Sequence, residues 1–307
     1  MLMTETDRQT LEELERRLKT LLPETYQDRY DEVQPVSMGS AGLKYGLDGK
    51  VAWNEMWATF CDLAMAGGPP HKGMLLEPAP AGEIEESPER YASVVAEICR
   101  GITMVTDLDA ERSSNPGWVR VECLTRAMAA WLVRAISMEN VAVRADGVML
   151  ELPAGPRYRL EKEIKNVVTA IAKTTHYWQS HMSIMQRSAI AALLDGMEGE
   201  SPLVAPSYRY DDHELRESIA AGAAEVIRRD TGLVRSLHRY ADWLGIECSD
   251  VRAAVWLMRM MSVLNVVSRR EGPALFVPVN PATDPQGEVV VSSLALAHRL
   301  AVGEAVM

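Results

Sequence analysis

The chain has 307 residues, of which 47% are hydrophobic and 24% are charged, values typical of a folded globular protein rather than a disordered or fibrous one. Its formal net charge of -11 opposes binding to nucleic acid or to an anionic membrane. The sequence contains no apolar run of about 18 residues, and its charged N-terminal segment does not resemble a secretory signal, so we expect a cytoplasmic protein.

The first expected element is an amphipathic helix within an N-terminal arm, residues 1–30. Its apolar face is a leucine stripe with intervals of three or four residues, formed by Leu11, Leu14, Leu18 and Leu21. A narrow stripe of this kind either packs on its own domain, which we favour, or forms a contact with a second copy or a protein partner.

Residues 31–115 are predicted to form a first, degenerate αβ unit. Asp48-Gly49 indicates a turn, and a helical pattern runs from Trp53 to Gly67. Ser87-Pro88 predicts the start of a second helix that continues to about Met104, because serine suits the N-cap position and proline suits the first helical position.

The clearest feature of the sequence is an internal repeat at a distance of 125 residues. Trp118 to Pro153 aligns with Trp243 to Pro278 without a gap. Fourteen of the 36 aligned positions are identical, against about two expected from average composition. We therefore predict a duplicated unit, in residues 116–200 and 243–307, with a structure common to both copies.

The shared residues predict strand, helix, two strands and helix (βαββα) in each copy. Thr125 and Asp250 are expected N-caps, and Asn140 and Asn265 suit the left-handed conformation at a helix end. A glycine turn then joins two strands of a hairpin. A third copy is suggested by Trp57, Gly73 and Leu76, whose spacing matches Trp131, Gly147 and Leu150.

Between the copies the sequence predicts helices. Residues 159–194 are free of proline and glycine and indicate one long helix or two abutting helices. Asp211 or Asp212 is expected to cap a helix through Arg229, and a further helix is expected from Gly232 to Trp243, so residues 201–242 form a helical insertion. The predicted fold is α+β and helix-rich, with duplicated units related by pseudo-symmetry around a cleft.

Candidate binding residues come from the repeated helix and hairpin. Arg134 and Arg259 lie in apolar helices, where a guanidinium needs an acceptor. The acceptor is either the carboxylate or phosphate of a ligand or, in a purely structural arrangement, Glu122 or Glu247 with the arginine stacked on the preceding tryptophan. The further candidates for ligand binding are Asn140, Asn265, Arg144 and Arg269, of which the two arginines could instead be solvated strand residues.

A glycine-rich loop, Ala66 to Gly73, supplies the candidate catalytic groups. Gly68 permits close approach to a ligand, and His71 and Lys72 offer a titratable group and a cation, although the loop could simply end a helix. His176 and His181 are five residues apart, which on a continuous α-helix turns them about 140° away from each other. We therefore interpret them as interface or surface histidines; a metal site there would require ligands from elsewhere in the chain.

The sequence favours one functional hypothesis over another without naming a reaction or a cofactor. The first is binding, with or without transformation, of a small anionic metabolite in the cleft between the repeats. The alternative is a non-catalytic assembly protein that uses the repeats and the N-terminal helix for protein contacts. The four cysteines are scattered singly and are expected to be small interior residues.

Overall fold

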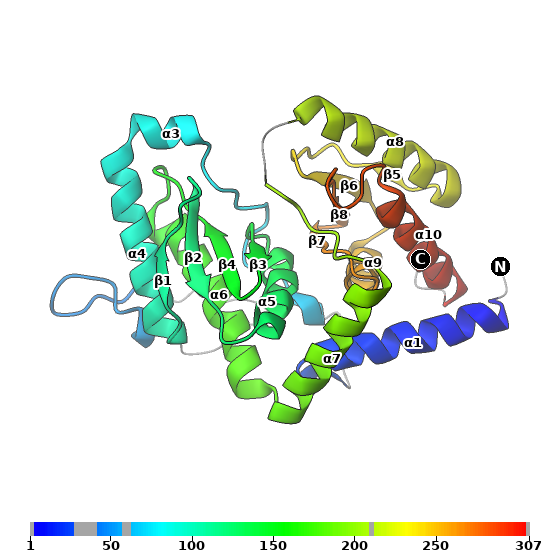
Figure 1. The fold of residues 1–307 in the computed structure, drawn as a ribbon, viewed down its shortest axis with the longest axis horizontal. Helices are drawn as coiled ribbons and strands as arrows, with labels where there is room; N and C mark the ends of the chain where they lie inside the picture. Colours follow the sequence, from blue (N-terminus) through cyan, green and yellow to red (C-terminus); the bar gives the residue numbers. More distant parts are fainter. Residues whose placement is uncertain (1–2, 28–41, 57–62, 209–211, 305–307) are drawn as a thin grey trace. The chain divides into compact units, whose positions relative to one another are not determined.

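The computed structural model describes residues 3–27, 42–56, 63–208 and 212–304. They belong to two compact units, here called the central unit, Gln34–Ser183, and the terminal unit, Met1–Val33 with Ile184–Met307. Each unit combines helices with one antiparallel four-stranded sheet (Figure 1), so the predicted α+β class is confirmed. No helix within the described ranges has the length and apolar character needed to cross a membrane.

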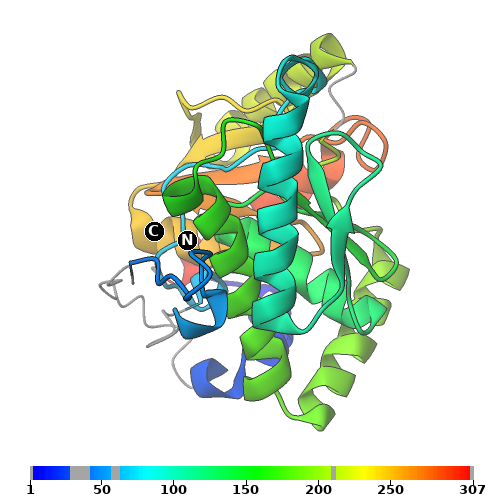
Figure 2. The same cartoon turned by 90° about the vertical axis from the view of Figure 1, so that its left-hand side faces the viewer.

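The central unit packs two helices on its sheet and a third helix on those two. Its strands are β1 (Ala110–Arg112), β2 (Trp118–Glu122), β3 (Arg144–Asp146) and β4 (Met149–Pro153), in the spatial order β1-β2-β4-β3. Helix α4 (Pro88–Thr106) contacts β1 and β2, and α5 (Arg126–Met138) contacts β3 and β4. Helix α6 (Lys165–His176) contacts both α4 and α5, and Figure 2 shows it beside α4.

The terminal unit repeats this arrangement. Its strands are β5 (Val234–Arg235), β6 (Trp243–Glu247), β7 (Arg269–Glu271) and β8 (Ala274–Pro278), in the spatial order β5-β6-β8-β7. Helix α8 (His213–Thr231) contacts β5 and β6, α9 (Val251–Val263) contacts β7 and β8, and α10 (Glu288–Gly303) contacts α8 and α9. The element order in each unit is therefore αββαββα.

The repeated segments follow the predicted local structure closely. The registers match, because Trp118 pairs with Pro153 in one sheet and Trp243 pairs with Pro278 in the other. The side chains of Thr125 and Asp250 each accept a hydrogen bond from the backbone amide three residues later, as N-caps do. The turns between the hairpin strands contain glycines with φ values of 61° and 56°.

Two predictions about the region before the second repeat are wrong. The expected helix from Gly232 to Trp243 is absent, because Val234 and Arg235 form β5 and pair with β6. Helix α8 is also not an insertion without a counterpart, since it precedes two strands and contacts them as α4 does in the central unit. The pairing of β5 with β6 is a tertiary contact, and it overrides the weak helical pattern of the segment.

Asn140 and Asn265 have positive φ values of 59° and 60°, as predicted, and each holds a preceding segment of chain. The Asn140 amide donates to the Lys72 carbonyl at 2.9 Å, and the Asn140 carbonyl accepts from the Leu76 amide. In the terminal unit the Asn265 amide donates to the carbonyl of Ser201 at 2.6 Å. The same residue thus performs the same structural task in both units.

The region proposed as a third copy is built differently. Between residues 63 and 86 the described chain has a short 3-10 turn, Ala64–Ala66, helix α3 (Ala81–Glu86) and no named strand. Leu76 forms a parallel bridge with Val141, so it belongs to the edge of the central unit rather than to a hairpin of its own. Trp57 lies outside the described residues.

The N-terminal helix α1 (Glu5–Leu21) packs within the terminal unit. Its four stripe leucines are all buried, and the helix contacts α9 and α7 (Ile184–Glu200). Arg17 adds a bidentate ion pair with Glu200 of α7, at 2.8 and 2.9 Å. The packed-arm interpretation of the leucine stripe is therefore confirmed; the short helix α2 (Glu24–Gln27) follows it.

The long apolar segment that was expected as one or two helices contains two helices and two π-helical turns. One π turn, η3 (Leu160–Ile164), precedes α6, and the other, η4 (Tyr177–His181), follows it. Met182 then has extended backbone, and α7 begins at Ile184. Ser87 and Asp212 occupy the N-cap positions of α4 and α8, as expected, but their side chains make no capping hydrogen bond. Asp211, the other expected N-cap, lies outside the described residues.

Candidate functional site

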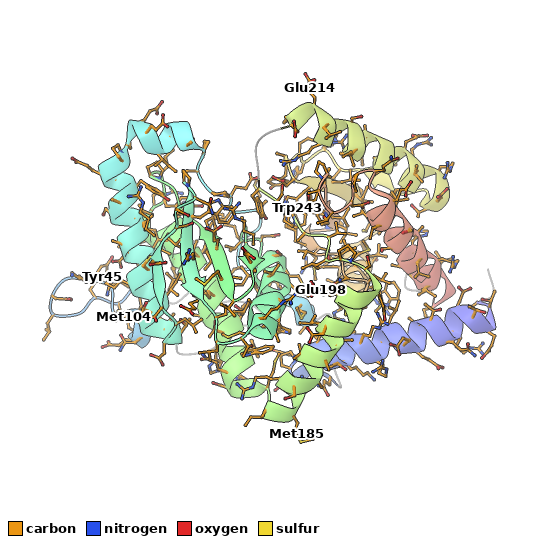
Figure 3. The ribbon with its side chains drawn as sticks, viewed as in Figure 1. Tyr45, Met104, Met185, Glu198, Glu214 and Trp243 are labelled. Atoms are coloured by element: carbon orange, nitrogen blue, oxygen red, sulfur yellow. The ribbon has the colours of Figure 1, made fainter. Side chains whose placement is uncertain are left out.

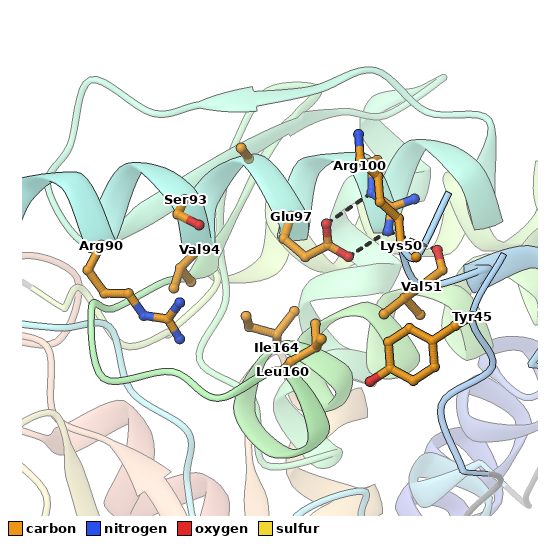
Figure 4. Close-up of a pocket in the computed structure, with 12 residues that line it drawn as sticks. Tyr45, Lys50, Val51, Arg90, Ser93, Val94, Glu97, Arg100, Leu160 and Ile164 are labelled. Atoms are coloured by element: carbon orange, nitrogen blue, oxygen red, sulfur yellow. Dashed lines mark hydrogen bonds and ion pairs between the residues drawn. The ribbon is translucent and has the colours of Figure 1, made fainter. Parts of the chain in front are cut away.

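A pocket of about 440 Å³ lies in the central unit beside α4 and is shown in Figure 4. One wall is α4, another is the loop that carries Tyr45 and Val51, and the apolar residues Leu160 and Ile164 come from η3 (Figure 4). The full lining consists of Tyr45, Gly49, Lys50, Val51, Arg90, Ser93, Val94, Ala96, Glu97, Arg100, Leu160 and Ile164.

The polar side of the pocket is a stripe along one edge of α4. Arg90, Ser93, Glu97 and Arg100 follow each other at intervals of three or four residues, which places them on one helix face. The neighbouring face of α4 carries the residues that pack on the sheet and on α6, among them Tyr91, Ile98 and Ile102. The amphipathic pattern of α4 therefore separates a structural face from a pocket face.

Glu97 and Arg100 fix the loop to the helix. The Glu97 carboxylate accepts two hydrogen bonds from Arg100, at 2.6 and 2.9 Å, and one from the indole nitrogen of buried Trp53 at 2.9 Å. Arg100 also donates to the Val51 carbonyl at 2.8 Å. The hydrogen bonds with Glu97 raise the pKa of Arg100 above its usual value. This pair is consequently occupied in holding the wall in place.

The other two cations of the pocket have no carboxylate partner among the described residues. Arg90 donates one hydrogen bond, to the Tyr158 carbonyl. The Lys50 backbone amide donates to Asp48, and its ammonium has no hydrogen-bond partner in the described part of the chain. The lining charges are three cations, Lys50, Arg90 and Arg100, against one anion, Glu97. Tyr45, on the same loop as Lys50, is 54% exposed (Figure 3). The pocket is thus positively charged in a chain whose formal net charge is -11.

The predicted catalytic residues His71 and Lys72 do not line this pocket. The His71 side chain is 4% exposed, and its Nδ1 lies 3.6 Å from Glu139 Oε2. Burial lowers the pKa of His71, although Glu139 opposes this effect. The Lys72 ammonium lies 3.6 Å from Glu163, and the Gly68 amide donates to the Leu63 carbonyl. The loop thus separates the two side chains and gives them different partners.

The structure shows a buried ion cluster around His71 that we did not predict from the sequence. The Glu139 carboxylate is fully buried and accepts hydrogen bonds from the Lys173 ammonium at 2.8 Å and from the amides of Ala64 and His71. Burial alone would raise the pKa of Glu139, but the charges of Lys173 and His71 outweigh it and lower the pKa. The cluster joins α5, α6 and the glycine-rich loop.

Arg134 and Arg259 are buried in their helices, 2% and 3% exposed. Arg134 donates to the Ala130 carbonyl of its own helix at 2.8 Å. The alternative partners considered from the sequence are wrong, because Glu122 and Glu247 lie at the strand ends β2 and β6 and pair with neither arginine. Neither arginine lines the α4 pocket.

Arg144 and Arg269 are stacked on aromatic rings and are not solvated strand residues. Arg144 lies 4.5 Å from the ring centre of Trp118 and pairs with Glu151 at 2.6 Å. Arg269 is fully buried, lies 4.9 Å from the ring centre of Trp243, and pairs with Glu271 at 2.7 Å. The alternative interpretation of these two arginines as solvated strand residues is therefore wrong.

The carboxylate that pairs with the tryptophan-stacked arginine stands at different aligned positions in the two units. Glu151 corresponds to Phe276, and Glu271 corresponds to Asp146. In the terminal unit Glu271 also accepts from Tyr240 at 2.6 Å and contacts His238 at 3.0 Å. Each unit thus neutralises a tryptophan-stacked arginine with its own acid, which indicates a structural task.

The described cysteines are free. Cys123 and Cys248 are buried, as expected, and Cys99 is only partly buried. Burial raises the pKa of Cys123 and Cys248 to about 12, so both are protonated at neutral pH. Cys61 lies outside the described residues.

Sequence reasoning missed the pocket, although one signal for it was present. The polar residues of α4 have helical spacing in the sequence, but so do the solvated faces of most amphipathic helices. What distinguishes this face is the loop of Tyr45 and Lys50, whose position depends on tertiary contacts. No family model, no curated protein and no solved structure matches this chain.

Proposed function

We propose that the protein binds a small anionic metabolite, with a carboxylate or phosphate group, in the α4 pocket. The observation that supports this proposal is the pair of cations, Arg90 and Lys50, that line the pocket without a carboxylate partner among the described residues. Each of the two cations offers charge-assisted hydrogen bonds to an anionic group bound beside it.

The shape and lining of the pocket narrow the ligand class. A volume of about 440 Å³ lies in the usual range for sites that bind small molecules. Leu160, Ile164 and Val94 add apolar surface to the lining, so the ligand would combine an anionic group with an apolar part. Ser93 and Tyr45 could add hydrogen bonds to the anionic group or to a hydroxyl.

The proposal covers binding and assigns no reaction. The hypothesis that His71 and Lys72 transform the ligand has no support from the pocket, because neither residue lines it. The predicted cleft between the repeats and the common origin of the two units stay predictions, with the shared strand order as support for the second. The alternative function, protein recruitment through α1, loses its main support because the leucine stripe is buried.

Native mass spectrometry of the full chain, purified without denaturant, tests the proposal. We expect a bound small molecule of fixed mass, or, where purification removes it, binding of added anions such as inorganic phosphate or succinate measured by calorimetry. The variant Arg90→Gln with Lys50→Gln should abolish binding, and the control Arg157→Gln, an exposed arginine outside the pocket, should retain it. Equal binding by the double variant would refute the proposal.

A further inference from the structure

His176 and His181 form a close pair at the end of α6, contrary to the expectation from an α-helix. Their Nε2 atoms are 3.1 Å apart, and the ring centres are 4.9 Å apart with an angle of 72° between the rings. The reason is the π turn η4, because a hydrogen bond from residue i to residue i+5 brings side chains five residues apart onto one side of the helix. The sequence-based estimate assumed α-helical spacing and was wrong.

The distance between the two nitrogens suits a shared metal ion. Zn²⁺ and similar ions bind imidazole nitrogen at about 2.0–2.1 Å, and two such bonds to nitrogens 3.1 Å apart enclose an angle of roughly 100°. This angle lies between the ideal values for octahedral and tetrahedral coordination. The pair therefore requires little rearrangement to hold an ion between the two rings.

The surroundings leave the site accessible. The His181 side chain is exposed, while His176 is half-buried. Burial, and to a smaller extent the charge of His181, lowers the pKa of His176. The ring of Tyr177 lies 5.1 Å from that of His181 and covers one side of it. π-Helical turns inside helices are frequent at functional sites.

We propose that His176 and His181 bind one divalent transition-metal ion of the kind that prefers imidazole, such as Ni²⁺, Cu²⁺ or Zn²⁺. Within the described ranges no group of three or more His, Cys, Asp or Glu side chains could hold a metal, so water or an anion completes the coordination. The ion would fix the last turn of the central unit, because His181 lies just before its final residue, Ser183.

Calorimetric titration of the full chain, free of any affinity tag, with Ni²⁺ in a non-coordinating buffer tests this site. We expect one ion per chain. His181→Asn and His176→Gln should each weaken binding at least about tenfold, because losing even a residue that only orients a metal ligand costs about 10- to 100-fold in affinity. The control His213→Asn, an exposed histidine at the start of α8, should bind as the wild type does.

A second measurement separates a shared ion from a hydrogen bond between two histidines. The electron paramagnetic resonance spectrum with one equivalent of Cu²⁺ should show coupling to two imidazole nitrogens in the wild type and to one in the His181→Asn variant. Circular dichroism confirms that each variant is folded. Absence of saturable Ni²⁺ binding, or equal Ni²⁺ affinity of the wild type and His181→Asn, would overturn the proposal.

Discussion

Removing the buried cation Lys173 should destabilise the central unit strongly. The substitution Lys173→Met keeps the apolar length of the side chain but leaves the Glu139 carboxylate buried without its cation. Breaking a buried ion pair by removing one partner costs about 3–5 kcal/mol. Two backbone amides, those of Ala64 and His71, still donate to Glu139, so we expect a loss near the lower end, about 3 kcal/mol.

The double variant Lys173→Met with Glu139→Gln tests whether the lost stability comes from an unpaired buried carboxylate. It removes the uncompensated charge and keeps an acceptor for a backbone amide, so it should be more stable than Lys173→Met alone. In the terminal unit the residue aligned with Glu139 is Leu264, which carries no charge. If the double variant is more stable than Lys173→Met, the side chains of residues 139 and 173 interact in the wild type.

The effect should also depend on pH in a defined direction. In the wild type the pKa of Glu139 is lower in the folded state than in the unfolded state. Its contribution to the free energy of unfolding is therefore fully present above the pKa of the unfolded state, and it is lost as the pH falls through the pKa of the folded state. Without Lys173 this contribution disappears. The difference in unfolding free energy between wild type and Lys173→Met should therefore be largest near neutral pH and shrink on acidification.

Native-state hydrogen exchange of the α5 amides is the suitable assay, because two compact units need not unfold in one transition. Lys162→Met, at an exposed position on η3, is the matched control and should change stability by less than about 0.5 kcal/mol. A loss below about 1 kcal/mol for Lys173→Met, at neutral pH, would refute the buried ion pair.

Three further substitutions test the packing of the two units. Gly101→Ala should lower the free energy of unfolding, measured by urea titration, by about 1–3 kcal/mol, because its Cβ would lie 2.8 Å from Val168. The control Gly196→Ala, in open space on α7, should be neutral or stabilising in the same measurement. Asn140→Ala should lower the stability, measured by thermal unfolding, by about 2–3 kcal/mol, because alanine is strained at positive φ and cannot make the hydrogen bond of the Asn140 side chain. Asn140→Gly should lower it less, because glycine adopts positive φ without strain. Arg269→Met should lower the free energy of unfolding more at pH 7 than in acid. The pKa of its partner Glu271 is lowered in the folded state, so the stabilisation by this pair is present above the unfolded pKa and is lost as the pH falls through the folded pKa; equal losses at neutral and acidic pH would contradict this pairing.

The sequence by itself determined the local structure of the repeat. The caps at Thr125 and Asp250, the positive φ of Asn140 and Asn265, and the hairpin turns depend on backbone stereochemistry and on hydrogen bonds between residues close in the chain. Such features are the same wherever the segment is placed. They can therefore be predicted from residue types and their spacing.

Only the tertiary structure decided the pairings between distant segments. The conversion of residues 234–235 into a strand required β6, the neutralisation of Glu139 required α6, and the α4 pocket required a loop fixed by Glu97 and Arg100. The π turn that joins His176 to His181 also departs from the period that sequence patterns assume. Contacts of this kind depend on which surfaces meet when the chain folds, and the local sequence does not encode that choice.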